Sequence, residues 1–137
     1  MRRHWPSLLL LSAAIALPSR ATAQNPTQAG AAKSAASAEA AVGTSIADRT
    51  LAGAAESFPA STDRLYCFSR ITNAANTEIE HVWYKGDVEQ GRVRLKVGGS
   101  PWRTYSSKTL PPDRSGEWRC DVVQAGTVLK SITFRVE

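Results

Sequence analysis

Apolar and polar residues alternate along the C-terminal half of the chain, from about residue 64 onward. An apolar period of two is typical of strands that bury one face, whereas a helix shows a period near 3.6. In the first alternating segment Leu65 and Cys67 share a face, and Tyr66 and Phe68 lie on the other. The pattern predicts six strands, over residues 65–71, 79–84, 92–97, 102–110, 118–122 and 128–136.

Turn-forming residues separate these predicted strands. Asn, Gly, Pro and Asp concentrate at 73–76, 85–87, 98–101, 111–116 and 125–126. In the last strand one face is expected to hold Val128, Ile132, Phe134 and Val136, with Lys130 interrupting it. Short strands joined by such turns predict an all-β fold, a small antiparallel sandwich or barrel.

The segment before this region has a different composition. Residues 24–63 are rich in Ala, Ser, Gly and Thr, and their few large apolar residues are Val42, Ile46, Leu51 and Phe58. Such a composition buries too little apolar surface to offset chain entropy. It predicts a flexible, disordered spacer over 24–63, with 46–51 as the best candidate for transient helix, followed by a folded domain over 64–137.

The first 23 residues have the features of a secretory signal peptide. Arg2 and Arg3 precede an apolar run over 8–17, and small residues follow at 21–23. The run is too short to span a bilayer, which needs about 20 residues. We expect cleavage after Ala23 and a periplasmic or extracellular location, with no transmembrane segment in the mature chain; the alternative is an uncleaved N-terminal anchor.

Removal of the signal peptide lowers the net positive charge of the chain, which affects the kind of partner to be expected. The full chain has a net charge of +5, but the part after Ala23 keeps 14 Lys and Arg against 12 Asp and Glu. The excess is concentrated in residues 64–137, with twelve basic and eight acidic residues. A basic exported domain favours an anionic partner, such as an acidic cell-envelope glycan or protein. Nucleic acid is not expected in that compartment.

The chain has two cysteines, Cys67 and Cys120, and Trp83 lies between them. Both cysteines are on predicted inward faces, and the order Cys, Trp, Cys is typical of immunoglobulin-like sandwiches with a disulfide between the sheets. An oxidising compartment favours a Cys67–Cys120 disulfide; the alternative is two buried free thiols. No close pair of Cys or His has the spacing of a zinc site, so neither a metal nor a cofactor is expected.

Candidates for catalysis are few. His81 is the one histidine after the signal, and the alternation of its strand places it on the same face as Trp83. We therefore expect a structural role for His81 more than a role as a general base. Ser106, Ser107 and Lys108 match no hydrolase signature, and we expect them in a solvated polar strand. These residues predict that the domain is not an enzyme.

The clearest binding feature is the stretch 90–112, which has five basic residues and no acidic one. Aromatic faces stack on sugar rings or pack into protein pockets, and arginine forms paired hydrogen bonds with carboxylates. The candidate binding residues are Trp102, Arg103, Tyr105, Lys108, Arg92 and Arg94. The alternative is that Trp102 covers the open end of the sandwich while the arginines line a solvated face.

Several sequence blocks resemble the bacterial DUF2914 family in their order along the chain. They are LYCFSRI (65–71), HVWY (81–84), VGG (97–99), WRTYSSK (102–108), GEWR (116–119) and FRV (134–136). The resemblance covers about Leu65 to Val136 and implies no assigned activity, because the family has none. It also implies that Cys120 departs from a mostly aliphatic family position, so the disulfide would be a property of this protein.

Together these features predict an exported cell-envelope module that binds a partner without catalysis. Two alternatives remain at this point: a purely structural or assembly domain, and a small hydrolase that depends on His81.

Overall fold

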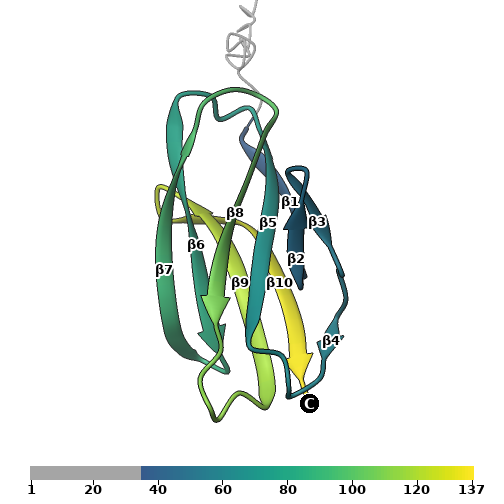
Figure 1. The fold of residues 1–137 in the computed structure, drawn as a ribbon. Coiled ribbons are helices and arrows are strands. Elements are labelled where there is room, and N and C mark those ends of the chain that lie inside the picture. The colour runs from purple at the N-terminus through teal and green to yellow at the C-terminus, as the bar shows by residue number, and fades with distance from the viewer. Residues whose placement is uncertain (1–34) are drawn as a thin grey trace, which may run out of the picture. The chain divides into compact units, whose positions relative to one another are not determined.

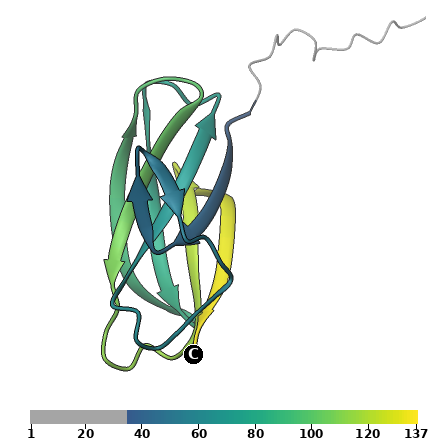
Figure 2. The same ribbon diagram turned by 45° about the vertical axis from the view of Figure 1, so that its right-hand side comes forward.

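The computed structural model describes residues 35–137, which form a two-layer β-sandwich without helix (Figures 1 and 2). No helix in this part of the chain has the length and apolar character needed to cross a membrane. The strands are β1 (Ser37–Gly43), β2 (Ser45–Ala47), β3 (Thr50–Ala52), β4 (Ser57–Phe58), β5 (Arg64–Thr72), β6 (Thr77–Lys85), β7 (Val88–Val97), β8 (Trp102–Thr109), β9 (Gly116–Gln124) and β10 (Thr127–Val136).

Two sheets pack face to face. One has the order β1-β5-β8 and the other β4-β10-β9-β6-β7, while β2 and β3 form a separate hairpin. Neighbouring strands are antiparallel, except that β4 runs parallel to β10. The predicted all-β immunoglobulin-like sandwich is therefore the observed architecture.

The six strands predicted after residue 64 are all present as β5 to β10. Their turns explain why the chain reverses where it does. Ala125 and Gly126 have positive φ values of 46° and 84° between the paired residues Gln124 and Thr127. Two central residues with positive φ match the right-handed twist of a hairpin, so β9 passes directly into β10.

The expectation of a disordered spacer up to residue 63 is wrong for residues 37–58, which form β1 to β4. β1 pairs with β5 along its whole length, from Ser37 opposite Thr72 to Gly43 opposite Tyr66. Its inward positions are Ala38, Ala40 and Val42. Because alanine adds little to the hydrophobic pattern, the composition of this segment is typical of a linker. The segment is instead stabilised as a strand by its pairing with the long neighbouring strand β5. The predicted signal peptide and the first part of the predicted spacer lie outside the described residues.

The transient helix expected at 46–51 is instead the β2–β3 hairpin. Asp48 and Arg49 both have positive φ, 50° and 61°, and Ala47 pairs with Thr50 around them. Two positive φ values in a two-residue loop favour a tight hairpin. The hairpin lies on the β1 side of the three-stranded sheet, where a Cβ at Gly43 would come within 2.8 Å of the Leu51 side chain.

The last strand departs from the predicted inward face at one position. Phe134 and Val136 are buried as expected, but Val128 is 51% exposed. The register of β10 against β9 shifts between Val128 and Lys130, which is a β-bulge. The extra residue turns Val128 to the outer face beside its partner Val123.

A disulfide between Cys67 and Cys120 joins the two sheets at the centre of the core, as the sequence predicts. The rings around it come from β6, β9 and β10: Phe134 stacks on Trp118 and meets Trp83 edge to face. Neither thiol is free. The alternative of two free buried thiols is therefore wrong for this structure.

Removing the cross-link is expected to lower the free energy of unfolding without changing the fold. For the sequence separation of 53 residues, the loop-entropy model gives about 4 kcal/mol as an upper figure. Urea unfolding of the oxidised protein and of the double variant Cys67→Ala/Cys120→Ala measures the difference. Equal midpoints, or two reactive thiols in the native wild-type protein, would contradict the prediction.

Candidate functional site

A polar cluster lies inside the sandwich, around the ring of His81. His81 on β6 is fully buried, and its Nε2 lies 2.9 Å from Ser69 Oγ on β5. Its Nδ1 lies 2.7 Å from Ser106 Oγ on β8, and Trp83 Nε1 donates to the same hydroxyl over 3.2 Å. A single side chain of the five-stranded sheet thus forms hydrogen bonds with two strands of the other sheet, the central strand β5 and the edge strand β8.

The arrangement satisfies every polar atom in the cluster when the ring is neutral. With the ring proton on Nε2, Ser106 accepts from Trp83 and donates to His81 Nδ1, while Nε2–H donates to Ser69. No buried side-chain nitrogen or oxygen in the described part of the chain lacks a partner. Burial lowers the pKa of His81 from 6.5 to about 4, because desolvation disfavours the charged ring.

The His81–Ser106 pair has the separation of a nucleophile and its base, but its surroundings do not suit catalysis. His81 is 0% exposed and Ser106 is 5% exposed, so a substrate cannot reach the hydroxyl. The second ring nitrogen contacts the Ser69 hydroxyl, where a catalytic base would meet an orienting carboxylate. Ser106 was expected in a solvated strand, and that expectation is wrong because β8 alternation turns it inward.

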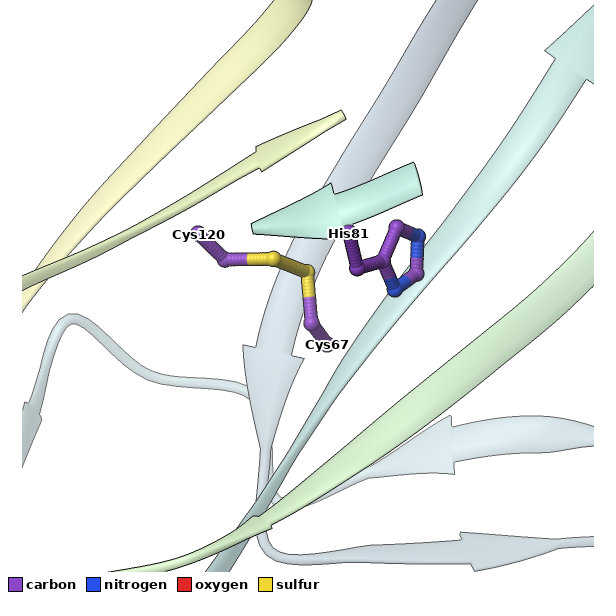
Figure 3. A group of neighbouring side chains, drawn as sticks. All are labelled: Cys67, His81 and Cys120. Atoms are coloured by element: carbon purple, nitrogen blue, oxygen red, sulfur yellow. A yellow bond between two sulfur atoms is a disulfide. The ribbon is translucent and has the colours of Figure 1, made fainter. Parts of the chain in front are cut away.

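The same cluster brings together three residues of types that bind metals, two cysteines and a histidine. Ligand atoms of Cys67, His81 and Cys120 lie within 4.8 Å of one another, and Figure 3 shows the imidazole beside the disulfide. Cysteine binds a metal as the thiolate, and the Cys67–Cys120 disulfide leaves no thiolate in this cluster. In this oxidised form the three residues are therefore part of the packed core and do not form a metal site.

The six predicted binding residues do not form one surface. Trp102 and Lys108 lie opposite Ile71 and Leu65 of β5, so they share the inward side of β8. The Trp102 ring lies against Gly98, where an added Cβ would come within 2.9 Å of it, and the side chain stays 38% exposed. Trp102 therefore packs against the segment between β7 and β8 and keeps part of its side chain exposed.

Lys108 joins the free edges of the two sheets. Gln90 is the extra residue where β6 and β7 lose register between Trp83 and Tyr84. Its backbone carbonyl accepts a hydrogen bond of 2.9 Å from Lys108 Nζ. The ammonium group is thus used within the fold.

Arg92 and Arg94 lie on the outer face of the five-stranded sheet, on the opposite side of the sandwich from the outer face of β8. Arg92 pairs with Glu80 at 3.0 Å and with Glu89 at 2.9 Å. The hydrogen bond to Glu89 raises the pKa of Arg92 further and lowers that of Glu89. Arg92 is therefore engaged by its own sheet.

Arg103 and Tyr105 point outward from the three-stranded sheet, and there they meet residues of β5. Arg103 is the register partner of Arg70, and Tyr105 is that of Phe68. The rings of Tyr105 and Tyr66 are 6.2 Å apart, edge to face. These five residues define the arginine–aromatic face.

Two of the five residues, Arg103 and Tyr105, are among those predicted from the sequence to bind, whereas the three residues of β5 are not. Alternation in β5 already places Tyr66, Phe68 and Arg70 opposite the inward cysteine. This alternation does not reveal that β5 pairs with β8, because two other strands separate them along the chain.

Acidification is expected to destabilise the fold through His81. The unfolded chain binds a proton with the ordinary pKa of 6.5, above the folded value of about 4. The stabilisation is therefore complete above pH 6.5 and is lost as the pH falls toward 4, by about 3 kcal/mol in total. Denaturant unfolding at several pH values across this window measures the loss.

The variant His81→Gln is the control, because it lacks the titrating ring whatever its absolute stability. Its unfolding free energy should fall less steeply over the same pH window. Identical slopes in the two proteins would contradict the assignment.

Comparison with known proteins bears on the fold and the family. A solved immunoglobulin-like protein from Pseudomonas aeruginosa is similar, with a TM-score of 0.56 and 17% identity, covering 79% of this chain and 100% of that chain. At this identity the likeness shows the fold alone, which is immunoglobulin-like. Comparison with curated proteins finds no match. A family model described as "Protein of unknown function (DUF2914)" matches residues 76–136, and this confirms the family resemblance predicted from the sequence.

Proposed function

We propose that this protein is an exported, non-enzymatic binding module, and that its arginine–aromatic face takes an anionic partner of the cell envelope. The observation that carries the proposal is the pairing of Arg70 with Arg103 directly across two strands. Like charges at such positions repel and destabilise the sheet. An anion bound between them would remove that repulsion.

The charges around these two arginines support the proposal. Neither side chain forms an ion pair with a carboxylate of residues 35–137. Glu39 is the register partner on the other side of Arg70, yet it forms no ion pair with it. The guanidinium groups are thus available to a ligand.

The opposite face of the molecule provides a contrast. On the five-stranded sheet Arg119 lies over the Tyr84 ring at 4.2 Å and pairs with Asp121 at 2.9 Å. Ser131 donates to the same carboxylate over 2.6 Å. Together with the ion pairs of Arg92, these contacts pair several of the charged side chains of that face with one another. This favours the outer face of the three-stranded sheet as the binding surface.

Two further points favour binding over catalysis. A family without assigned activity and an immunoglobulin-like fold agree with a non-enzymatic role. The one histidine of the described residues and its two serine partners are enclosed in the core. The signal-like N-terminus and the oxidised cysteine pair support export.

Site-specific photo-crosslinking in cells tests the proposal. A crosslinker at position 105 is expected to trap a discrete adduct, because Tyr105 is 46% exposed at the centre of the face. Mass spectrometry of the trapped species then distinguishes a glycan from a protein.

A crosslinker at Arg94, an exposed residue of the opposite sheet, provides the matched control and should trap no such species. Equal trapping at both positions, or a folded and oxidised protein that forms no adduct at 105, would count against this face as the binding site.

A further inference from the structure

We propose that the ligand of the arginine–aromatic face is a carboxylate-bearing polysaccharide, bound with a sugar ring on Tyr105 and Phe68 and a carboxylate on Arg70 and Arg103. This inference rests on the proposed function and specifies the partner. It combines two features of the face, its planar rings and its paired guanidinium groups.

The position of the arginines defines the anionic group. Opposite residues in an antiparallel pair have Cα atoms about 4.5–5.5 Å apart, so Arg70 and Arg103 reach the same ligand group. The planar guanidinium fork matches a carboxylate with two parallel hydrogen bonds. A pair of such forks therefore favours a ligand that carries carboxylates.

The aromatic rings of the face indicate the kind of molecule that carries the carboxylate. Phe68 and Tyr105 are the next outward pair along the same two strands, one pleat from the arginines. Tyr66 follows diagonally, with its ring 6.2 Å from that of Tyr105. A ligand held by the arginines thus extends over aromatic faces, which stack on the apolar side of a sugar ring.

The border of this face favours a glycan over a protein partner. Of the large hydrophobic residues that are strongly exposed, Tyr105 is the one that points outward here, and Ser107 and Thr109 continue the strand. A stable protein interface needs about 800 Å² per partner with an apolar core. A face with a single prominent ring and hydroxyl neighbours suits a polar, ring-containing polymer better.

The face is open on its β8 side. The β2–β3 hairpin contacts the sheet at β1, beside Gly43, and at β5, whereas Arg103 and Tyr105 lie on β8 at the far edge (Figure 1). A polymer can therefore reach Arg103 and Tyr105 from this edge of the sheet.

Affinity electrophoresis of the purified protein with three polymers tests the inference. Polygalacturonate carries both sugar rings and carboxylates, dextran carries rings without carboxylates, and polyglutamate carries carboxylates without rings. We expect polygalacturonate to bind at least 10-fold more tightly than either of the other two.

Two variants of the face and one control separate the contributions. Arg70→Ala/Arg103→Ala and Tyr105→Ala should each weaken polygalacturonate binding by at least 10-fold. Arg94→Ala/Lys96→Ala removes two exposed positive charges from the other sheet and should change it by less than 2-fold. Unchanged thermal midpoints show that the variants are folded; for a variant that unfolds, Arg70→Lys/Arg103→Lys keeps the charge, loses the fork and should still weaken binding.

Several outcomes would overturn the inference. Polyglutamate bound as tightly as polygalacturonate, with Tyr105→Ala neutral, would mean simple attraction of polyanions. No binding to polygalacturonate, together with a protein adduct at position 105, would reject the glycan while leaving the binding function in place. Absence of both would reject the two proposals together.

Discussion

The connection between the two sheets at their centre is the constraint on which the rest of the structure depends. Apolar burial is non-directional and would allow the sheets to slide or change register. The Cys67–Cys120 disulfide and the His81 ring remove that freedom. Since the ring must bond Ser69 and Ser106 together, β5 and β8 have one register in which the buried polar atoms are satisfied, and a slip of one residue would turn these side chains outward.

A fixed register on the inner side also fixes what lies on the outer side. With Ser69 opposite Thr104 and Cys67 opposite Ser106, the outward partners between them are Phe68 and Tyr105. The arginine–aromatic face is therefore a consequence of the buried network. The composition of the outer faces then differs: the five-stranded sheet pairs charges such as Arg119 and Asp121 internally, and the three-stranded sheet leaves Arg70 and Arg103 side by side.

Much of the fold could be predicted from local pattern, because each of β5 to β10 alternates strongly enough to indicate its own inward face. The disulfide was predicted from the same alternation together with the expected oxidising compartment. Two errors have physical causes that no local pattern contains. The alanines of β1 pack against the core only through pairing with β5, and Val128 turns outward only because a bulge precedes Lys130.

The candidate site was less predictable than the fold, and the reason is the order of the strands. A run of basic and aromatic residues along 90–112 has the appearance of one surface, but alternation divides β8 between its two sides and β7 belongs to the other sheet. Trp102 and Lys108 are consequently engaged within the fold, and Arg103 and Tyr105 acquire partners from residues 66–70 instead. Recognition in such a sandwich is a property of adjacent strands, so the charge and ring pattern of any single segment is informative only after its neighbour in the sheet is known.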